Sequence, residues 1–198
     1  MTFNKTKPEE SWLETTVSAL SAGLQTLDTG QLAALRRLAV GGPGCGPFWD
    51  LAARADFIDD TARVEGWMRL VKIMALLTPK GERNKTTPLH KPEQRLGKVL
   101  CDGGTSGWEG SPPRPFLSEA RLARLLAQPA GQRGLALERI ARALAGHMQE
   151  GNGVNCVDIA ALLLLPDPTH TKRDLARAYY KRLDAAARSP SPTPEPRP

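Results

Sequence analysis

Apolar side chains recur along most of the chain at the i, i+3, i+4 spacing of an amphipathic α-helix. The strongest stripe runs from Val64 to Ala75 and includes a tryptophan and two methionines, which is typical of a helix packed in a protein core. The same spacing predicts helices over residues 9–27, 30–39, 92–101, 117–128, 137–148, 154–165 and 171–187. The alternating pattern of a β-strand does not extend over a useful length. We therefore expect an all-α fold with no sheet of consequence.

Polar residues stand where several of these helices are expected to begin. Asp28 or Thr29, Asp60 and Ser118 each carry a side-chain oxygen that can accept a hydrogen bond from the free N–H groups of a first helical turn. They are predicted helix caps. The segment PAGQRG, residues 129–134, contains a proline and two glycines and predicts a turn between two helices.

Gly- and Pro-rich segments suggest how the chain is divided. Residues 103–115 are rich in Gly, Ser and Pro and predict a flexible connector. We expect an N-terminal helical lobe at residues 9–102 and a C-terminal helical lobe at residues 116–187, two helical bundles packed on each other. The final segment, residues 188–198, contains five prolines and is expected to be disordered.

The sequence offers little that would support catalysis or metal binding. Its three histidines are far apart, and a zinc site needs converging ligands. Cys156 with His147 is the one candidate nucleophile–base pair, but Cys156 begins an apolar segment, where a thiol is usually inert. Neither GGPGCG nor DGGTSG has the context of a phosphate-binding loop. We therefore expect no enzyme: no catalytic residue, no metal and no cofactor.

No stretch is apolar for long enough to predict a membrane span, and no signal-peptide pattern is found. The three cysteines are an odd number without a CxxC motif, which is typical of a reducing compartment. These features predict a cytoplasmic protein without a membrane partner.

The net charge of +6 suggests a polyanionic partner. In the predicted helix 117–128, Leu122 and Leu125 occupy the apolar face, whereas Arg121 and Arg124 stand one turn apart on another face without Glu119 beside them. Two uncompensated guanidiniums on a packed helix suit a phosphate backbone. Because Trp and Tyr are few and mostly lie on apolar faces, contact with the backbone fits better than base stacking.

Five segments, taken in chain order, carry a resemblance to a known family: LDTGQLAALRRLA, RLGKVLCDGG, LSEARLARLLAQ, LERIARALA and DLARAYYKRL. Together they resemble the CasB family, the small subunit of the type I-E CRISPR surveillance complex Cascade. The resemblance covers about residues 12–183. It implies a helical, non-catalytic subunit that binds DNA and RNA without reading their sequence and stabilises the guide RNA–target DNA R-loop in antiviral defence.

The resemblance also implies partners and contact residues. The partners would be the other Cascade subunits (backbone CasC and large subunit CasA), a second copy of the chain, guide RNA and target DNA. The matching basic positions, predicted to bind nucleic acid, are Arg36, Arg37, Lys98, Arg121, Arg124, Arg139 and Arg142.

Two other functions fit the same sequence. One is a helical scaffold that contacts only proteins, in which case the arginines would be scattered over the surface. The other is a helix-turn-helix regulator built on residues 117–144. Against the second, the predicted PAGQRG turn is longer than the usual three to four residues, and few amide side chains are present to read base edges.

Overall fold

The computed structural model describes residues 8–79, 87–105, 114–148 and 151–188. Within these ranges the chain is all-α, as predicted, and its only β-type pairing is an isolated parallel bridge between His90 and Val154. The elements in order are α1 (Pro8–Thr26), α2 (Thr29–Arg36), α3 (Gly46–Arg54), the 3-10 helix η1 (Thr61–Arg63), α4 (Val64–Leu77), α5 (Leu96–Asp102), α6 (Glu119–Ala127), α7 (Ala130–Leu144), α8 (Cys156–Leu164) and α9 (Thr169–Arg188). None of the described helices combines the length and the apolar character needed to cross a membrane.

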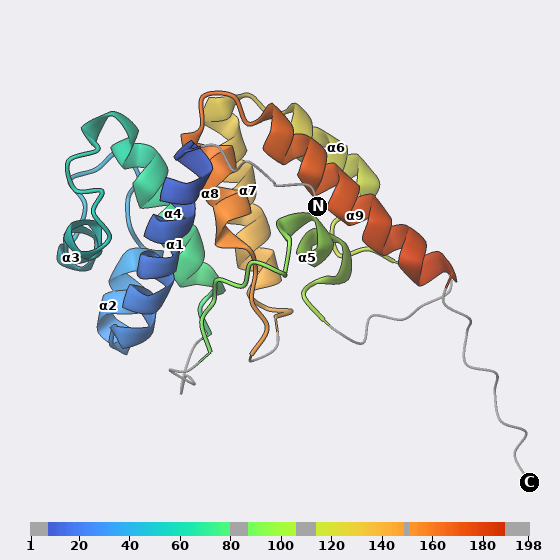
Figure 1. Ribbon diagram of the computed structural model, residues 1–198. Helices are drawn as coiled ribbons and strands as arrows, with labels where there is room; N and C mark the ends of the chain where they lie inside the picture. The colour runs from blue at the N-terminus through green and yellow to red at the C-terminus, as the bar shows by residue number, and fades with distance from the viewer. Residues whose placement is uncertain (1–7, 80–86, 106–113, 149–150, 189–198) are drawn as a thin grey trace, which may run out of the picture.

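Helix α4 lies near the centre of the molecule and packs against α2, α7 and α8 (Figure 1). Its predicted apolar stripe is confirmed, since Val64 is half-buried and the other members of the stripe are buried. Trp67 is fully buried; it stacks on Phe57 at a ring-centroid distance of 4.4 Å and meets Trp12 edge-on at 5.5 Å. These contacts tie α1 and the segment before η1 to the core.

Helix α9 packs along α5 and also contacts α8. Leu175 and Tyr179 form its buried face, and the Tyr179 hydroxyl donates to the carbonyl of Leu117 at 2.5 Å. The side chain of the neighbouring Tyr180 is 46% exposed. Tyr179 and Tyr180 are adjacent, and a helix turns neighbouring side chains by about 100°, so both cannot share one narrow face.

Helices from both predicted lobes contribute to one hydrophobic cluster. Helix α4 packs against α7 and α8, and α5 packs against α9. The cluster joins Trp67 and Leu100 with Ile159 and Tyr179. Of the predicted connector, residues 106–113 lie outside the described residues. The predicted tail also lies outside them, except for Arg188, which ends α9.

The three predicted caps have different outcomes. The Asp28 cap is confirmed: its carboxylate accepts from the backbone N–H of Gln31 at 2.8 Å, and the Gln31 side chain accepts from the N–H of Asp28. Ser118 occupies the N-cap position of α6, but its side chain makes no capping hydrogen bond. The Asp60 cap is wrong, because its carboxylate instead accepts from Trp67 Nε1 and from an arginine side chain in η1, both at 2.8 Å.

The predicted PAGQRG turn is also wrong. Only Gln128 and Pro129 separate α6 from α7, and the remaining residues of the segment form the first turns of α7. Arg133 in these turns is buried, and its guanidinium donates to the carbonyl oxygens of Leu162 at 2.7 Å and of Gln128 at 3.3 Å. These bonds satisfy carbonyl groups at the C-terminal ends of α8 and α6, which have no partner within their own helices.

Candidate nucleic-acid interface

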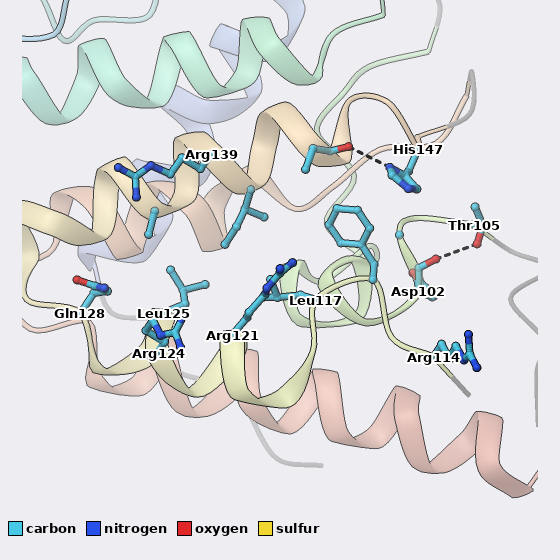
Figure 2. A pocket seen from close by; sticks show the side chains of 15 residues that line it. Asp102, Thr105, Arg114, Leu117, Arg121, Arg124, Leu125, Gln128, Arg139 and His147 are labelled. Atoms are coloured by element: carbon cyan, nitrogen blue, oxygen red, sulfur yellow. Dashed lines mark hydrogen bonds between the residues drawn. The ribbon is translucent and has the colours of Figure 1, made fainter. Parts of the chain in front are cut away.

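A pocket of about 830 Å³ lies between α6 and α7, which run in opposite directions on its two sides (Figure 2). Residues on either side of residues 106–113, namely Gly103, Thr105, Arg114, Phe116 and Leu117, form its third side. We call this hollow the α6–α7 pocket. It is lined by Asp102, Gly103, Thr105, Arg114, Phe116, Leu117, Arg121, Arg124, Leu125, Gln128, Ala136, Arg139, Ile140, Ala143 and His147.

The amphipathic pattern of α6 places its arginines at this pocket. Leu122 and Leu125 are almost fully buried, as predicted, and they hold α6 on the rest of the protein. Arg121 and Arg124 are exposed and line the pocket. Glu119 engages Tyr180 of α9: burial first, and then the hydrogen bond with Glu119, raise the pKa of Tyr180. Its carboxylate is therefore directed to α9 and leaves the two arginines uncompensated.

The floor of the pocket is apolar and partly aromatic. Phe116 and His147 meet edge-to-face with ring centroids 4.9 Å apart, and Ile140 and Ala143 of α7 continue the surface. The position of Phe116 is fixed by the backbone, since its N–H donates to the carbonyl of Cys101 at 2.9 Å. The floor is therefore built on α5 and α7, two helices that are packed into the core.

The pocket carries an excess of positive charge. Within the described ranges, no carboxylate forms an ion pair with Arg121, Arg124 or Arg139. The one acidic residue of the lining, Asp102, has a fully buried carboxylate that accepts from Arg182 Nε at 2.8 Å and lies 3.5 Å from Lys98 Nζ. The charge of Asp102 is therefore compensated by Arg182 and Lys98. The charges of the three arginines are not compensated by it.

Two of the predicted contact residues have acidic partners within the protein. Lys98 is engaged by Asp102, and also donates to the side chain of Gln94 at 2.8 Å. Arg142 pairs with the buried carboxylate of Glu138, which also accepts from Lys72 of α4 at 3.0 Å. The structure therefore places Lys98 and Arg142 outside the pocket lining and in ion pairs within their own helices, with acidic partners that also bind a second helix.

The remaining two predicted residues lie on or next to α2, at the other end of the molecule from α6 (Figure 1). Arg36 donates from Nε to the carbonyl of Ala75 at 2.9 Å and from Nη2 to that of Thr78 at 2.8 Å, which satisfies the end of α4. Arg37 is exposed. Of the seven predicted residues, the structure brings together Arg121, Arg124 and Arg139.

Most of the lining residues were not among the predicted contact residues, including the cationic Arg114 and the aromatic Phe116 and His147. Arg114 and Phe116 lie in or beside the Pro-rich connector, and His147 follows the end of α7. No periodic pattern joins these positions. Only the return of the chain from α5 to α6 brings them to one surface, so the sequence contains no short-range signal for them.

The candidate nucleophile–base pair is not assembled. His147 lines the pocket, whereas the backbone N–H of Cys156 donates to Nδ1 of a different histidine, His90, at 3.1 Å. Burial raises the pKa of the Cys156 thiol far above its usual range, and burial followed by the charge of Asp102 raises that of Cys101 to about 11. Thiols of this kind are poor nucleophiles at neutral pH. Among the described residues, no three His, Cys, Asp or Glu side chains gather as a metal site.

Comparison with protein-family models, curated proteins and solved structures found no match to this chain. A function is therefore inferred from the chemistry of the α6–α7 pocket together with the pattern of the sequence.

Proposed function

We propose that the chain binds the sugar–phosphate backbone of nucleic acid at the α6–α7 pocket and acts as a non-catalytic small subunit of a type I-E Cascade complex. The observation that supports backbone binding is the convergence of Arg121, Arg124 and Arg139, from two helices, on one pocket in which no described carboxylate pairs with them. Three exposed guanidiniums in one place attract anionic oxygens, and phosphates offer such oxygens in a regular row.

The proposed binding is independent of sequence. Arginines that contact phosphates fix the position of a strand but read no base edges. In Cascade the sequence would be read by pairing between guide RNA and target DNA, while this subunit adds positive charge along the R-loop. The order of the five sequence segments supports this setting, and the subunits CasC and CasA, a second copy of the chain, guide RNA and target DNA are its proposed partners.

The arrangement of α6 and α7 favours this function over a helix-turn-helix regulator. The two helices run back along each other, whereas the helices of that motif cross at about 90–120°. The arginines of both helices also face the hollow between them. A recognition helix would instead present its reading side chains outward, into the major groove. Because the link between α6 and α7 is the short Gln128–Pro129, the length of the turn does not argue against a helix-turn-helix motif. The orientation of the two helices argues against it instead.

The decisive experiment is the double substitution Arg121→Ala/Arg124→Ala in the full chain. We expect weaker binding of DNA oligonucleotides of unrelated sequence, by a similar factor for each, because phosphates are common to all of them. Each lost phosphate contact should reduce the slope of log K against log salt concentration by about 0.7 on a single strand or about 0.9 on a duplex. Fluorescence anisotropy across a salt titration measures both effects.

A matched control removes the same charge elsewhere. Arg54 in α3 and Arg173 in α9 are exposed and do not line the pocket, so Arg54→Ala/Arg173→Ala lowers the net charge equally. We expect this control to retain most of the affinity and nearly the full salt slope. If both double variants bind as the wild type does, or lose affinity equally, the pocket is not the binding surface.

A further inference from the structure

The α6–α7 pocket has more room and more apolar surface than phosphate binding requires. Arginines on a flat surface can bind phosphates, because a bound phosphate stays in contact with water and needs no enclosing pocket. The pocket instead has a volume of about 830 Å³, within the roughly 300–1,000 Å³ typical of sites that enclose a small organic molecule. Its floor includes Phe116, Ile140 and Ala143. A ligand that fills it must carry an apolar body as well as negative charge.

We infer that the α6–α7 pocket accepts an unpaired nucleobase, while the phosphates on either side of that base bind Arg121, Arg124 and Arg139. The inference rests on the proposed function and specifies which part of the nucleic acid enters the site. A nucleobase has a flat apolar face, and the covalently attached phosphates supply the charge that the arginines require. Both parts of the pocket are then used by one ligand.

The aromatic pair at one end of the pocket is suited to such a base. Phe116 meets His147 edge-to-face at 4.9 Å, and the Phe116 N–H is bound to α5, so the ring is held before any ligand arrives. Stacking on an aromatic ring is tolerant of base identity, since every base has a π-face. The site therefore stays independent of sequence, in agreement with the proposed function.

The pocket also explains how a strand would be selected. A base in a duplex is stacked and paired, and it must be unpaired and unstacked before it can enter a protein pocket, which costs free energy. A nucleotide that is already unpaired avoids this cost. The α6–α7 pocket should therefore favour unpaired nucleotides over a duplex with the same number of phosphates.

The test compares two single-stranded DNA oligonucleotides of equal length and phosphate number, one with normal bases and one with abasic sites throughout. Binding to the full chain is measured by fluorescence anisotropy at one salt concentration. We expect the wild type to bind the normal strand about tenfold more tightly, which corresponds to the loss of one base–aromatic contact.

A pocket-filling variant separates the base from the phosphates. Ala143 lies on the pocket side of α7 and is exposed, so Ala143→Leu reduces the space for a base without changing any charge or adding an aromatic ring. We expect this variant to bind the two strands equally, at the affinity that the wild type shows for the abasic strand. The control is Ala123→Leu, on an exposed position of α6 outside the lining, which should keep the tenfold preference. Circular dichroism checks that both variants are folded.

The outcomes distinguish this inference from the proposed function. Equal binding of both strands by the wild type would overturn the base site, while backbone binding, tested separately by the salt titration of the arginine variants, would stay in place. A preference that survives Ala143→Leu would also overturn it, because the base would then bind elsewhere. Failure of the wild type to bind either strand would overturn both proposals and favour a protein partner for the pocket.

Discussion

At the scale of single residues, burial and hydrogen bonding of the imidazole ring favour the neutral form of His90. Nδ1 accepts a hydrogen bond from the backbone N–H of Cys156, so this nitrogen carries no proton. Nε2 is buried and has no hydrogen-bond partner among the residues that the structure describes. Burial lowers the pKa of His90, although the nearby charges of Glu14, Asp158 and Glu93 act in the opposite direction. The neutral ring thereby links residues 87–91 to the start of α8.

We expect this link to weaken in mild acid. The folded protein binds the His90 proton less readily than the unfolded chain does, so the stability contributed by His90 is present above the unfolded pKa of about 6.5. It is lost as pH falls through the lower folded pKa. The variant His90→Asn should lose less stability than the wild type when pH is lowered from about 7.5 to about 5, because the amide oxygen accepts the same bond and does not titrate.

Thermal unfolding followed by circular dichroism across this pH range makes the comparison. At the higher pH the two proteins should melt at similar temperatures, since the hydrogen bond to the Cys156 N–H is kept. If the melting temperatures of wild type and variant fall in parallel with pH, then other groups cause the acid sensitivity and His90 does not.

At the scale of helices, the close packing of α5 on α9 depends on Gly97. A Cβ atom at this position would lie 2.0 Å from the carbonyl oxygen of Leu175 and 3.0 Å from the side chain of Ala178. A carbonyl oxygen in the body of a helix cannot move without breaking its own hydrogen bond. The two helices would have to separate, although a methyl group is otherwise favourable in a helix.

The substitution Gly97→Ala should therefore reduce the free energy of unfolding by about 1–3 kcal/mol or more, as overpacking does in cores. Gly131→Ala is the control: it lies in the first turn of α7 with no atom within 4 Å of the added Cβ, and should stabilise the protein by about 0.5–1 kcal/mol. Urea denaturation measures both. A neutral Gly97→Ala would mean that α5 and α9 adjust their spacing freely.

Helices with a strong apolar period could be predicted from sequence, and those with a weak one could not be placed accurately. The apolar stripe of α4 and the leucines of α6 allowed both helices to be predicted, because burial on one face of a helix appears as a local pattern in the chain. The start of α7 was missed because its first turns contain Gly131 and Gly134. The position of Arg133 is explained mainly by its hydrogen bond to the carbonyl of Leu162. This bond joins residues from different helices.

The same distinction applies to the candidate site. The spacing of Arg121 and Arg124 placed them on one exposed face, which the structure shows. The hydrogen bonds of Arg36 to α4 depend on tertiary structure and could not be foreseen. Lys98 and Asp102 are four residues apart, and their ion pair was within reach of sequence reasoning. Phe116 and His147 needed the fold to bring them together.

At the scale of the whole molecule, the two predicted lobes cover each other's apolar surfaces. Helix α4 is covered by α7 and α8, and α5 is covered by α9 and α8. The described parts of the two predicted lobes, residues 9–102 and 116–187, therefore share one cluster of buried residues. The α6–α7 pocket is supported by both, because α5 fixes Phe116 and α9 fixes Leu117.

This arrangement predicts one cooperative unfolding transition. Trp12, Trp49 and Trp67 lie before α5, so tryptophan fluorescence reports mainly on the first half, whereas far-UV circular dichroism reports on helices throughout. In a urea titration the two signals should change together, as they do for a two-state domain. A fragment of residues 1–102 should be largely unfolded by itself, because the faces of α4 and α5 that α7, α8 and α9 cover would be exposed to water. Separate transitions, or a folded fragment, would show instead that the predicted lobes are independently stable and that the pocket can lose one side while the rest of the protein stays folded.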